Sequence, residues 1–343
     1  MFAGRRLVVL AVALAAAAML AVLVSISVGA VPIPLRTVWT VVAGHLPLID
    51  TSSDPVDEQI VWELRAPRAL LALVVGAGLS VAGVALQALV RNPLADPYVL
   101  GVASGASLGA VAVLALGSGA VAGLGLSAAA FAGAMLTMLA VFALARSHGT
   151  YTPGRLILAG VALGYLCSSL TSFLQFRVDP QQLQGILFWL LGSVAGATWP
   201  DLTTPTLVVL TCTGWLVLQG RRLNALSVGE ESAVALGVDV RRFRVELMLV
   251  SSVLVGAVIA VSGGIGFVGL VIPHIVRLLV GPDHRRVLPL SALLGGLFLV
   301  WVDVASRVAA APAELPIGIF TAAIGAPFFL WLMRRASRVE GGT

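Results

Sequence analysis

The chain contains no lysine, and all 21 of its basic residues are arginines. The phosphate-binding loop G-x-x-x-x-G-K-[ST] requires a lysine, so this chain cannot hold that nucleotide site. Cysteine is equally scarce: Cys167 and Cys212 lie in apolar runs, without the spacing of a disulfide framework or a metal site. We therefore predict no catalytic residue, no bound cofactor and no metal ligand on this chain.

Charged side chains are also few. They make up 11% of the residues, whereas soluble domains have about 25%. Hydrophobic residues reach 59% and the mean hydropathy is +1.03, which excludes an ordinary soluble domain. The composition predicts an all-α polytopic membrane protein in contact with the lipid bilayer. The net charge of +5 does not indicate a nucleic-acid partner, because the arginines are spread over the ends of apolar segments.

Ten apolar runs are candidates for membrane-spanning helices, each of which needs about 20 mainly apolar residues. The first run has 23 residues, more than the usual ~7–15 of a signal peptide, so we expect it to be retained. A further run, 185–197, is too short to span and is predicted to be a partial or interfacial helix. The ten runs cover residues 7–29, 66–89, 98–117, 119–145, 156–174, 201–219, 245–262, 266–280, 288–306 and 316–333.

The arginines predict the orientation of the chain, because basic residues concentrate on the cytoplasmic side of a membrane protein. With ten spans and the N-terminus inside, 16 of the 21 arginines fall inside and five outside. Both termini are therefore predicted to be cytoplasmic. Within one membrane domain over residues 1–343, segment 30–65 is predicted to be extracytoplasmic and segment 221–244 cytoplasmic.

Segment 221–244 is a polar interruption with five arginines and three acids between two apolar runs. Ser227 and Glu230 have the spacing of a capping box, and Gly237 suits the end of a short helix. This pattern predicts a short amphipathic helix at the membrane surface. The alternative is an ordinary solvated loop with one helical turn.

The turn 91–97 is bracketed by Pro93 and Pro97, which fix φ and remove amide donors. We expect it to be stiff, although it could be a simple connection. Glycines 101, 105 and 109 have the spacing of closely packed helices. The segment Gly263–Gly266 is predicted to be an outside loop.

Ionisable residues are missing from the middle of the ten runs. Carriers driven by an ion gradient usually place carboxylates or broken helices at mid-depth. This absence argues against a secondary transporter, although a site built from unwound backbone would escape the test.

Five motifs, in order along residues 60–335, resemble the FecCD-type permease subunits of bacterial ABC importers for iron–siderophores, haem and vitamin B12. The resemblance implies ten helices per subunit, a second permease copy as homodimer or close heterodimer, two ATP-binding subunits that use ATP and Mg²⁺, and an extracytoplasmic substrate-binding protein. The motifs are GVALQALVRNPLADPYVLGVASGASLGA (83–110), RLILAGVALG (155–164), LNALSVGEESAVALGV (223–238), GFVGLVIPHIVRLLVGPDHRRVLP (266–289) and ELPIGIFTAAIGAPFFLWL (314–332).

The resemblance also implies roles for individual residues. Three arginines, Arg65, Arg68 and Arg307, match positions that meet acidic residues of the binding protein; interfacial snorkelling or pairing with Asp303 is the alternative. The cytoplasmic gate matches Asn92, Pro93 and Leu94, with a second element at Thr152 and Pro153, where the sequence departs from the family's small hydroxyl residues. Contact with the ATPase is implied for Leu223, Asn224, Leu226, Gly229, Glu230, Glu231, Ala235 and Gly237.

The predicted function is inward transport of a metal chelate across the bacterial cytoplasmic membrane, driven by ATP hydrolysis on a separate subunit. Iron(III)-siderophore is the expected cargo, with haem and cobalamin as alternatives, because the substrate is read by the binding protein. An ion-coupled secondary transporter, or a membrane scaffold or sensor that transports nothing, remains the alternative from another class.

Overall fold

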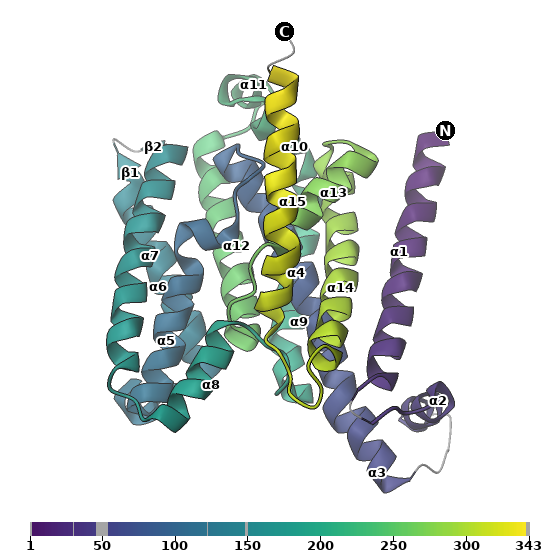
Figure 1. Cartoon of the computed structure of the whole chain (residues 1–343). Helices are drawn as coiled ribbons and strands as arrows, with labels where there is room; N and C mark the ends of the chain where they lie inside the picture. The colour runs from purple at the N-terminus through teal and green to yellow at the C-terminus, as the bar shows by residue number, and fades with distance from the viewer. Residues whose placement is uncertain (1, 30, 46–53, 122, 148–149, 341–343) are drawn as a thin grey trace.

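A computed structural model gives the fold and describes residues 2–29, 31–45, 54–121, 123–147 and 150–340. A helix overlaps each of the ten predicted runs (Figure 1). These helices are α1 (Phe2–Ser27), α4 (Ala66–Val90), α5 (Val102–Leu116), α6 (Leu126–Ala145), α7 (Pro153–Gln175), α9 (Trp199–Leu218), α12 (Val240–Ser262), α13 (Val268–Val280), α14 (His284–Val308) and α15 (Ile317–Glu340).

The remaining elements are short. The run 185–197 overlaps one of them, the 11-residue helix α8, in agreement with its prediction as too short to span. These remaining elements are α2 (Leu35–Gly44), α3 (Pro55–Glu58), a π-helix (Gln59–Arg65), 3₁₀-helices (Pro97–Leu100 and Ser118–Val121), α8 (Pro180–Leu190), α10 (Gly220–Val228), α11 (Glu230–Ala235), and the antiparallel strands β1 (Arg146–Ser147) and β2 (Thr150–Tyr151).

Seven of the described helical segments are long and apolar enough to cross a membrane, and three apolar helices are shorter. One of the seven, Pro55–Val90, starts 11 residues before the predicted run 66–89. It starts early because the Asp54 side chain caps the helix by accepting from Val56 N, and Pro55 suits its first turn. The helix therefore begins within the predicted outer segment 30–65, ahead of the apolar run.

Helix α4 lies in the middle of the bundle and packs along α14 (Figure 1). The two backbones approach closely because glycines face each other: a Cβ on Gly76 would lie 2.7 Å from Leu299 Cβ, and one on Gly295 would lie 2.5 Å from Gly76 O. The predicted close packing at Gly105 is confirmed in the same way, since a Cβ there would lie 2.5 Å from Gly133 O on α6.

Helix α13 begins inside the bundle. A Cβ on Gly269 would lie 3.3 Å from Gly83 Cα, well inside α4, and Gln87 Nε2 donates to Gly269 O (3.1 Å). Its 13 residues rise about 20 Å, short of the ~30 Å of a hydrocarbon core. The helix within the apolar run 266–280 is therefore shorter than the hydrocarbon core is thick, and it begins only after the turn at Phe267, whose φ is 67°.

The segment before α13 is packed against protein. Backbone carbonyls at the end of α8 surround it: a Cβ on Gly264 would lie 2.6 Å from Leu190 O, and Gly263 is in tight contact with Trp189 O. Gly318 N also donates to Leu191 O (3.0 Å). The predicted loop Gly263–Gly266 is thus partly buried where α8, α12 and α15 meet.

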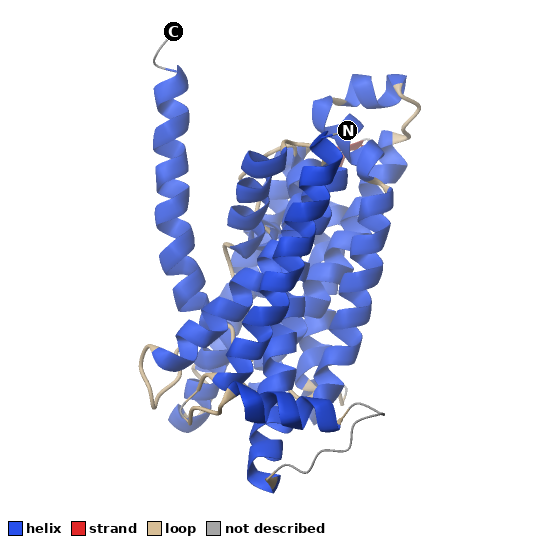
Figure 2. Ribbon diagram, turned by 90° about the vertical axis from the view of Figure 1, so that its right-hand side faces the viewer, coloured by secondary structure: helices blue, strands red, loops and turns tan. Residues whose placement is uncertain are grey.

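The N-terminus, the C-terminal end of α15 and helices α10 and α11 lie at one end of the bundle, and α2, α3 and α8 at the other (Figure 1). The predicted grouping of the termini with segment 221–244, opposite segment 30–65, agrees with this arrangement. In the view of Figure 2 the spanning helices run along one common direction, and α15 stands at the edge of the bundle.

Candidate functional site

Segment 221–244 folds into α10 and α11, joined at Gly229, whose φ is 147°. The predicted capping box was wrong. Helix α10 continues through Ser227, whose hydroxyl donates back to Leu223 O (2.9 Å), so it does not cap Glu230's helix. The predicted end is confirmed: Gly237 has φ 78°, its amide donates to Val234 O (2.9 Å), and Val238 N donates to Ala233 O (3.0 Å), as in a Schellman motif.

The two short helices have a buried and an exposed side. Leu223, Leu226 and Ala233 are buried against the bundle, whereas Glu231 and Ala235 are exposed. Three large apolar side chains also face outward: Val228, Val234 and Leu236 are 77%, 63% and 73% exposed. Apolar side chains gathered on an exposed polar segment are typical of a contact surface for another protein. The sequence prediction missed these three, although their apolar character within a polar segment was a usable signal.

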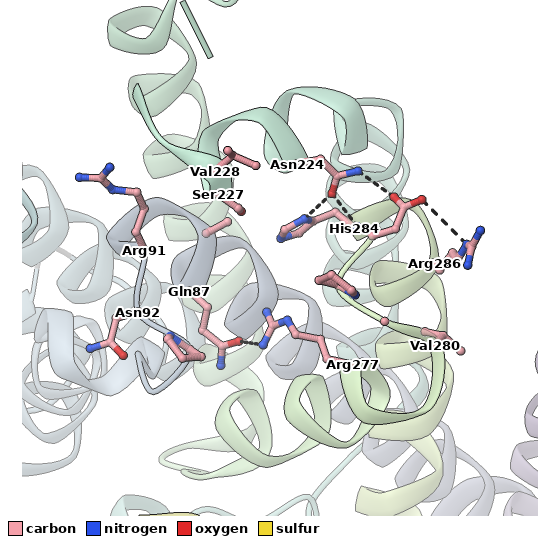
Figure 3. A pocket seen from close by; sticks show the side chains of 15 residues that line it. Gln87, Arg91, Asn92, Asn224, Ser227, Val228, Arg277, Val280, His284 and Arg286 are labelled. Carbon is pink, nitrogen blue, oxygen red and sulfur yellow. Dashed lines mark hydrogen bonds and ion pairs between the residues drawn. The ribbon is translucent and has the colours of Figure 1, made fainter. Parts of the chain in front are cut away.

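Asn224 connects α10 to the start of α14. Its Nδ2 donates to Asp283 Oδ1 (2.8 Å), and its Oδ1 accepts from the backbone N of His284 (2.9 Å) and lies 2.7 Å from His284 Nδ1 (Figure 3). Partial burial would raise the pKa of Asp283, but the Asn224 hydrogen bond and Arg285 outweigh it and lower that pKa to about 2. The carboxylate is therefore charged at neutral pH. Asp283 and His284, which the sequence prediction missed, fix α10 to the start of α14.

Glu230 connects α11 to two other elements. Its Oε1 accepts from Arg244 Nη2 (2.5 Å) at the start of α12, and it lies 3.7 Å from Arg91 Nη2 at the end of α4. Glu230 was predicted as an exposed coupling residue, and its side chain is 46% exposed. The structure adds that this carboxylate is bonded, and that one of its partners directly precedes the predicted gate residue Asn92.

The turn 91–97 is held by hydrogen bonds, as expected for a stiff connection. Arg91 ends α4 in the left-handed region (φ 52°). Asn92 Oδ1 then accepts from Leu94 N (2.9 Å), and Asp96 Oδ1 accepts from Tyr98 N (2.9 Å). Burial raises the pKa of Asp96 to about 6, although bonds from the backbone of Tyr98 and Phe267 oppose the rise.

The second predicted gate element lies at the start of α7. Thr152 is the residue before the helix and Pro153 its first residue. A cavity of about 230 Å³ lies between the turn and α7, and it is lined by Asn92, Leu94 and Ile157 among others. The structure thus brings the turn close to α7 at Ile157, one turn beyond Pro153, a contact that spacing alone could not predict.

A larger cavity of about 780 Å³ separates the turn 91–97 from α10 (Figure 3). Arg91, Asn92, Asn224 and Ser227 line it from these two elements. Arg277 on α13 and Gln87 on α4 also line the cavity, and Arg277 Nη1 donates to Gln87 Oε1 (2.6 Å). Two of the predicted gate residues, Asn92 and Pro93, and one predicted coupling residue, Asn224, therefore face a common space, which would change in shape if α10 moved toward the turn.

The three arginines predicted for docking meet acceptors within the chain. Arg68 Nε donates to Asp303 Oδ1 (2.9 Å), Arg307 Nε lies 3.2 Å from Asp303 Oδ2, and Arg65 donates to the carbonyls of Ile26, Ser27 and Val31. Pairing with Asp303, the alternative stated from the sequence, is therefore present. Docking of a partner is a separate property and stays a prediction.

Helix α7 carries an unusual exposed face. Ser168, Ser169, Ser172 and Tyr165 are all exposed on it, near the middle and the second half of the helix. The Ser168 hydroxyl donates to Ser104 Oγ on α5 (3.5 Å), and the face as a whole is more polar than lipid tails favour, so it suits a second protein surface or a water-filled path.

Long apolar helices joined to a folded polar segment with outward apolar side chains are typical of a multi-pass membrane protein that works with a soluble partner. Comparison with known proteins is consistent with this class, and residues 17–335 match the FecCD transport family. The chain belongs to this family. It is thus a transport permease and a multi-pass protein of the bacterial cytoplasmic membrane.

Relatives cover most of the chain. The hemin transport system permease protein HmuU of Yersinia pestis is 39% identical over 322 residues, 93% of each chain. The vitamin B12 import system permease protein BtuC of Vibrio cholerae is 44% identical over 280 residues, 82% of this chain and 84% of the relative. A solved metal-chelate type ABC transporter in an inward-facing conformation superposes with TM-score 0.80 and 35% identity, over 95% of this chain and 98% of that one.

Proposed function

We propose that this chain is the permease subunit of an ATP-driven importer and carries a metal chelate inward. The observation that carries the proposal is the coupling segment α10–α11. It presents Val228, Val234 and Leu236 to solvent while Asn224 and Glu230 bond it to α14 and α12. A surface of this kind can contact a soluble ATPase and transmit its conformational change to the spanning helices.

The proposed topology has ten spans, both termini cytoplasmic, segment 30–65 outside and segment 221–244 inside, within one domain over residues 1–343. The positive-inside distribution supports it, as does the position of both termini beside α10 and α11 (Figure 1). The shorter apolar segments Val102–Leu116 (α5), Val268–Val280 (α13) and Ile317–Leu332 (in α15) would complete the ten together with the seven longer ones.

The proposed assembly is two permease copies, two ATP-binding subunits and one extracytoplasmic substrate-binding protein. ATP and Mg²⁺ would be used by the ATP-binding subunits, and this chain would catalyse no reaction. The exposed serines of α7 support a path between two copies, because that face would then line water and the partner copy. The outer arginines Arg65, Arg68 and Arg307 are proposed to contact carboxylates of the binding protein.

The proposed cycle starts when ATP binding moves the coupling segment. Because the side chain of Asn224 bonds the first turn of α14, and α14 packs on α4 through Gly76 and Gly295, the three helices would move together. The turn 91–97 follows α4 directly, so its residues Asn92, Pro93 and Leu94 would open or close against α7. Thr152 and Pro153 are the proposed second element of this gate.

The cargo is proposed to be an iron(III)-siderophore, with haem and cobalamin as alternatives. Relatives named for hemin and vitamin B12, and a structure of metal-chelate type, support the wider class. The test is uptake of labelled ferric siderophore, haem and cobalamin, side by side, in cells with and without this chain. Loss of one signal identifies the cargo, whereas three unchanged signals would contradict the proposal.

Purification distinguishes the alternatives from other classes. An importer permease should co-purify with a lysine-bearing ATP-binding subunit, while an ion-coupled carrier would purify without one and its uptake would stop when ionophores collapse the ion gradients. A scaffold or sensor would give no uptake at all.

A further inference from the structure

Five charged residues gather at the outer end of α4 and α14. Asp303 is fully buried and bonds both Arg68 and Arg307, and Arg307 also donates to Ser25 O and Val28 O of the α1 region. Arg65 donates only to carbonyl oxygens in the contacts that the structure gives for it. With Glu314, the group holds three guanidinium groups and two carboxylates, so it has an excess positive charge.

The two carboxylates of this group differ. The side chain of Asp303 is 0% exposed and lies between two helices, so separating it from Arg68 and Arg307 would leave buried guanidinium groups without this partner. Glu314 comes from the connection between α14 and α15, and its side chain is 37% exposed. Both of its oxygens accept from Arg68 Nη1 at 2.9 Å. Arg68 itself is only 9% exposed, so Glu314 is the member of the pair that faces solvent.

We infer that Glu314 competes with the docking partner for Arg68: a carboxylate of the substrate-binding protein replaces Glu314 as the acceptor for the Arg68 guanidinium. The inference rests on the docking role proposed for Arg65, Arg68 and Arg307. It explains how an arginine with internal partners can still serve an interface. Buried Asp303 keeps Arg68 in place, and the exposed, exchangeable bond to Glu314 keeps its charge covered until the partner arrives.

Replacing Glu314 by another carboxylate has a small free-energy cost. A partly exposed ion pair shifts an equilibrium by about two- to fivefold, because water solvates both charges after separation. Glu314 would therefore weaken docking without preventing it, and would favour release of the binding protein once its substrate has passed.

The experiment measures the Kd between the assembled transporter in lipid nanodiscs and its substrate-binding protein at low ionic strength. Glu314→Gln should lower the Kd about two- to fivefold, since the amide no longer competes as a charge. Glu63→Gln is the matched control, because it removes the same charge from an exposed acid of the outer segment that has no contact with Arg68 in the described ion pairs. Glu314→Asp keeps the charge and should keep the Kd close to that of the natural protein.

An unchanged or higher Kd for Glu314→Gln, or an equal decrease in both Glu→Gln variants, would overturn the inference. If Glu314→Gln is poorly folded by its unfolding temperature, Glu314→Asp and a salt titration of the natural complex replace it. Arg65→Glu and Arg307→Glu test the docking role separately. A Kd that neither of them changes would refute docking at this surface itself, whatever Glu314 does.

Discussion

The bond between Asn224 and α14 gives the sharpest test of the coupling proposal. Asn224→Leu keeps the size of the side chain but removes its hydrogen bond to Asp283 and both contacts to His284. A neutral hydrogen bond contributes roughly 1 kcal/mol and one to a charged group about 1.5–3 kcal/mol, so the variant should lose about 2–4 kcal/mol of stability. His284, which is 4% exposed, would be left with unsatisfied donors.

Two measurements follow from this substitution. The free energy of unfolding in mixed micelles should fall by the amount above, and the substrate imported per ATP hydrolysed should fall while ATP hydrolysis continues. Ser227→Ala is the control on the same helix, because it removes only a bond to Leu223 O and should change stability by less than about 0.5 kcal/mol. Asn224→Asp keeps an acceptor for His284 but places a second carboxylate against that of Asp283, so it should also lose stability at neutral pH.

Acid provides an independent check on the same junction. Because the pKa of Asp283 is lowered to about 2, the carboxylate contributes stability above its ordinary pKa of about 4, and that stability is lost as the pH falls toward 2. Asn224→Leu should reduce this loss. An Asn224→Leu protein with natural stability and a natural transport-to-hydrolysis ratio would show that the bond from α10 to α14 does not couple the two helices.

Three further outcomes are expected. Glu231→Arg should reduce coupling without loss of stability, whereas Glu230→Arg should also lower the unfolding temperature, because it opposes Arg244 and Arg91; equal unfolding temperatures would contradict the assigned bonds. Gly76→Ala should destabilise the protein by about 1–3 kcal/mol by separating α4 from α14, measured against Gly214→Ala, where a Cβ meets open space. Stability should decrease as the pH rises from about 4 to about 6, because in this range the folded protein still holds the Asp96 proton that the unfolded chain has released. Asp96→Asn should remove this slope in a pH series of unfolding curves.

Hydropathy predicted the positions of the spanning helices because about 20 apolar residues in a row leave few other structures possible. It could not show where a helix begins within a run. Residues 266–280 form one apolar run, but composition does not record that the chain turns at Phe267, so that α13 begins only at Val268.

The candidate site was predictable only in part. Gly237 was found because a helix end in the left-handed region favours glycine, a local rule. The Ser227 prediction failed because its hydroxyl had a competing acceptor one turn earlier. The bonds from Asn224 to Asp283 and from Glu230 to Arg244 join distant or separately folded elements, and the spacing of residues does not encode such pairs.

The central claim is that this chain moves a substrate by using the ATP hydrolysed by a partner. The most direct measurement reconstitutes the chain with its ATP-binding subunit and binding protein in vesicles and follows the labelled chelate into their lumen. We expect transport that requires ATP and Mg²⁺ on the side of the coupling segment, continues without ion gradients and decreases in Asn224→Leu. Transport that needs an ion gradient but no ATP, or that is equally efficient in Asn224→Leu, would contradict it.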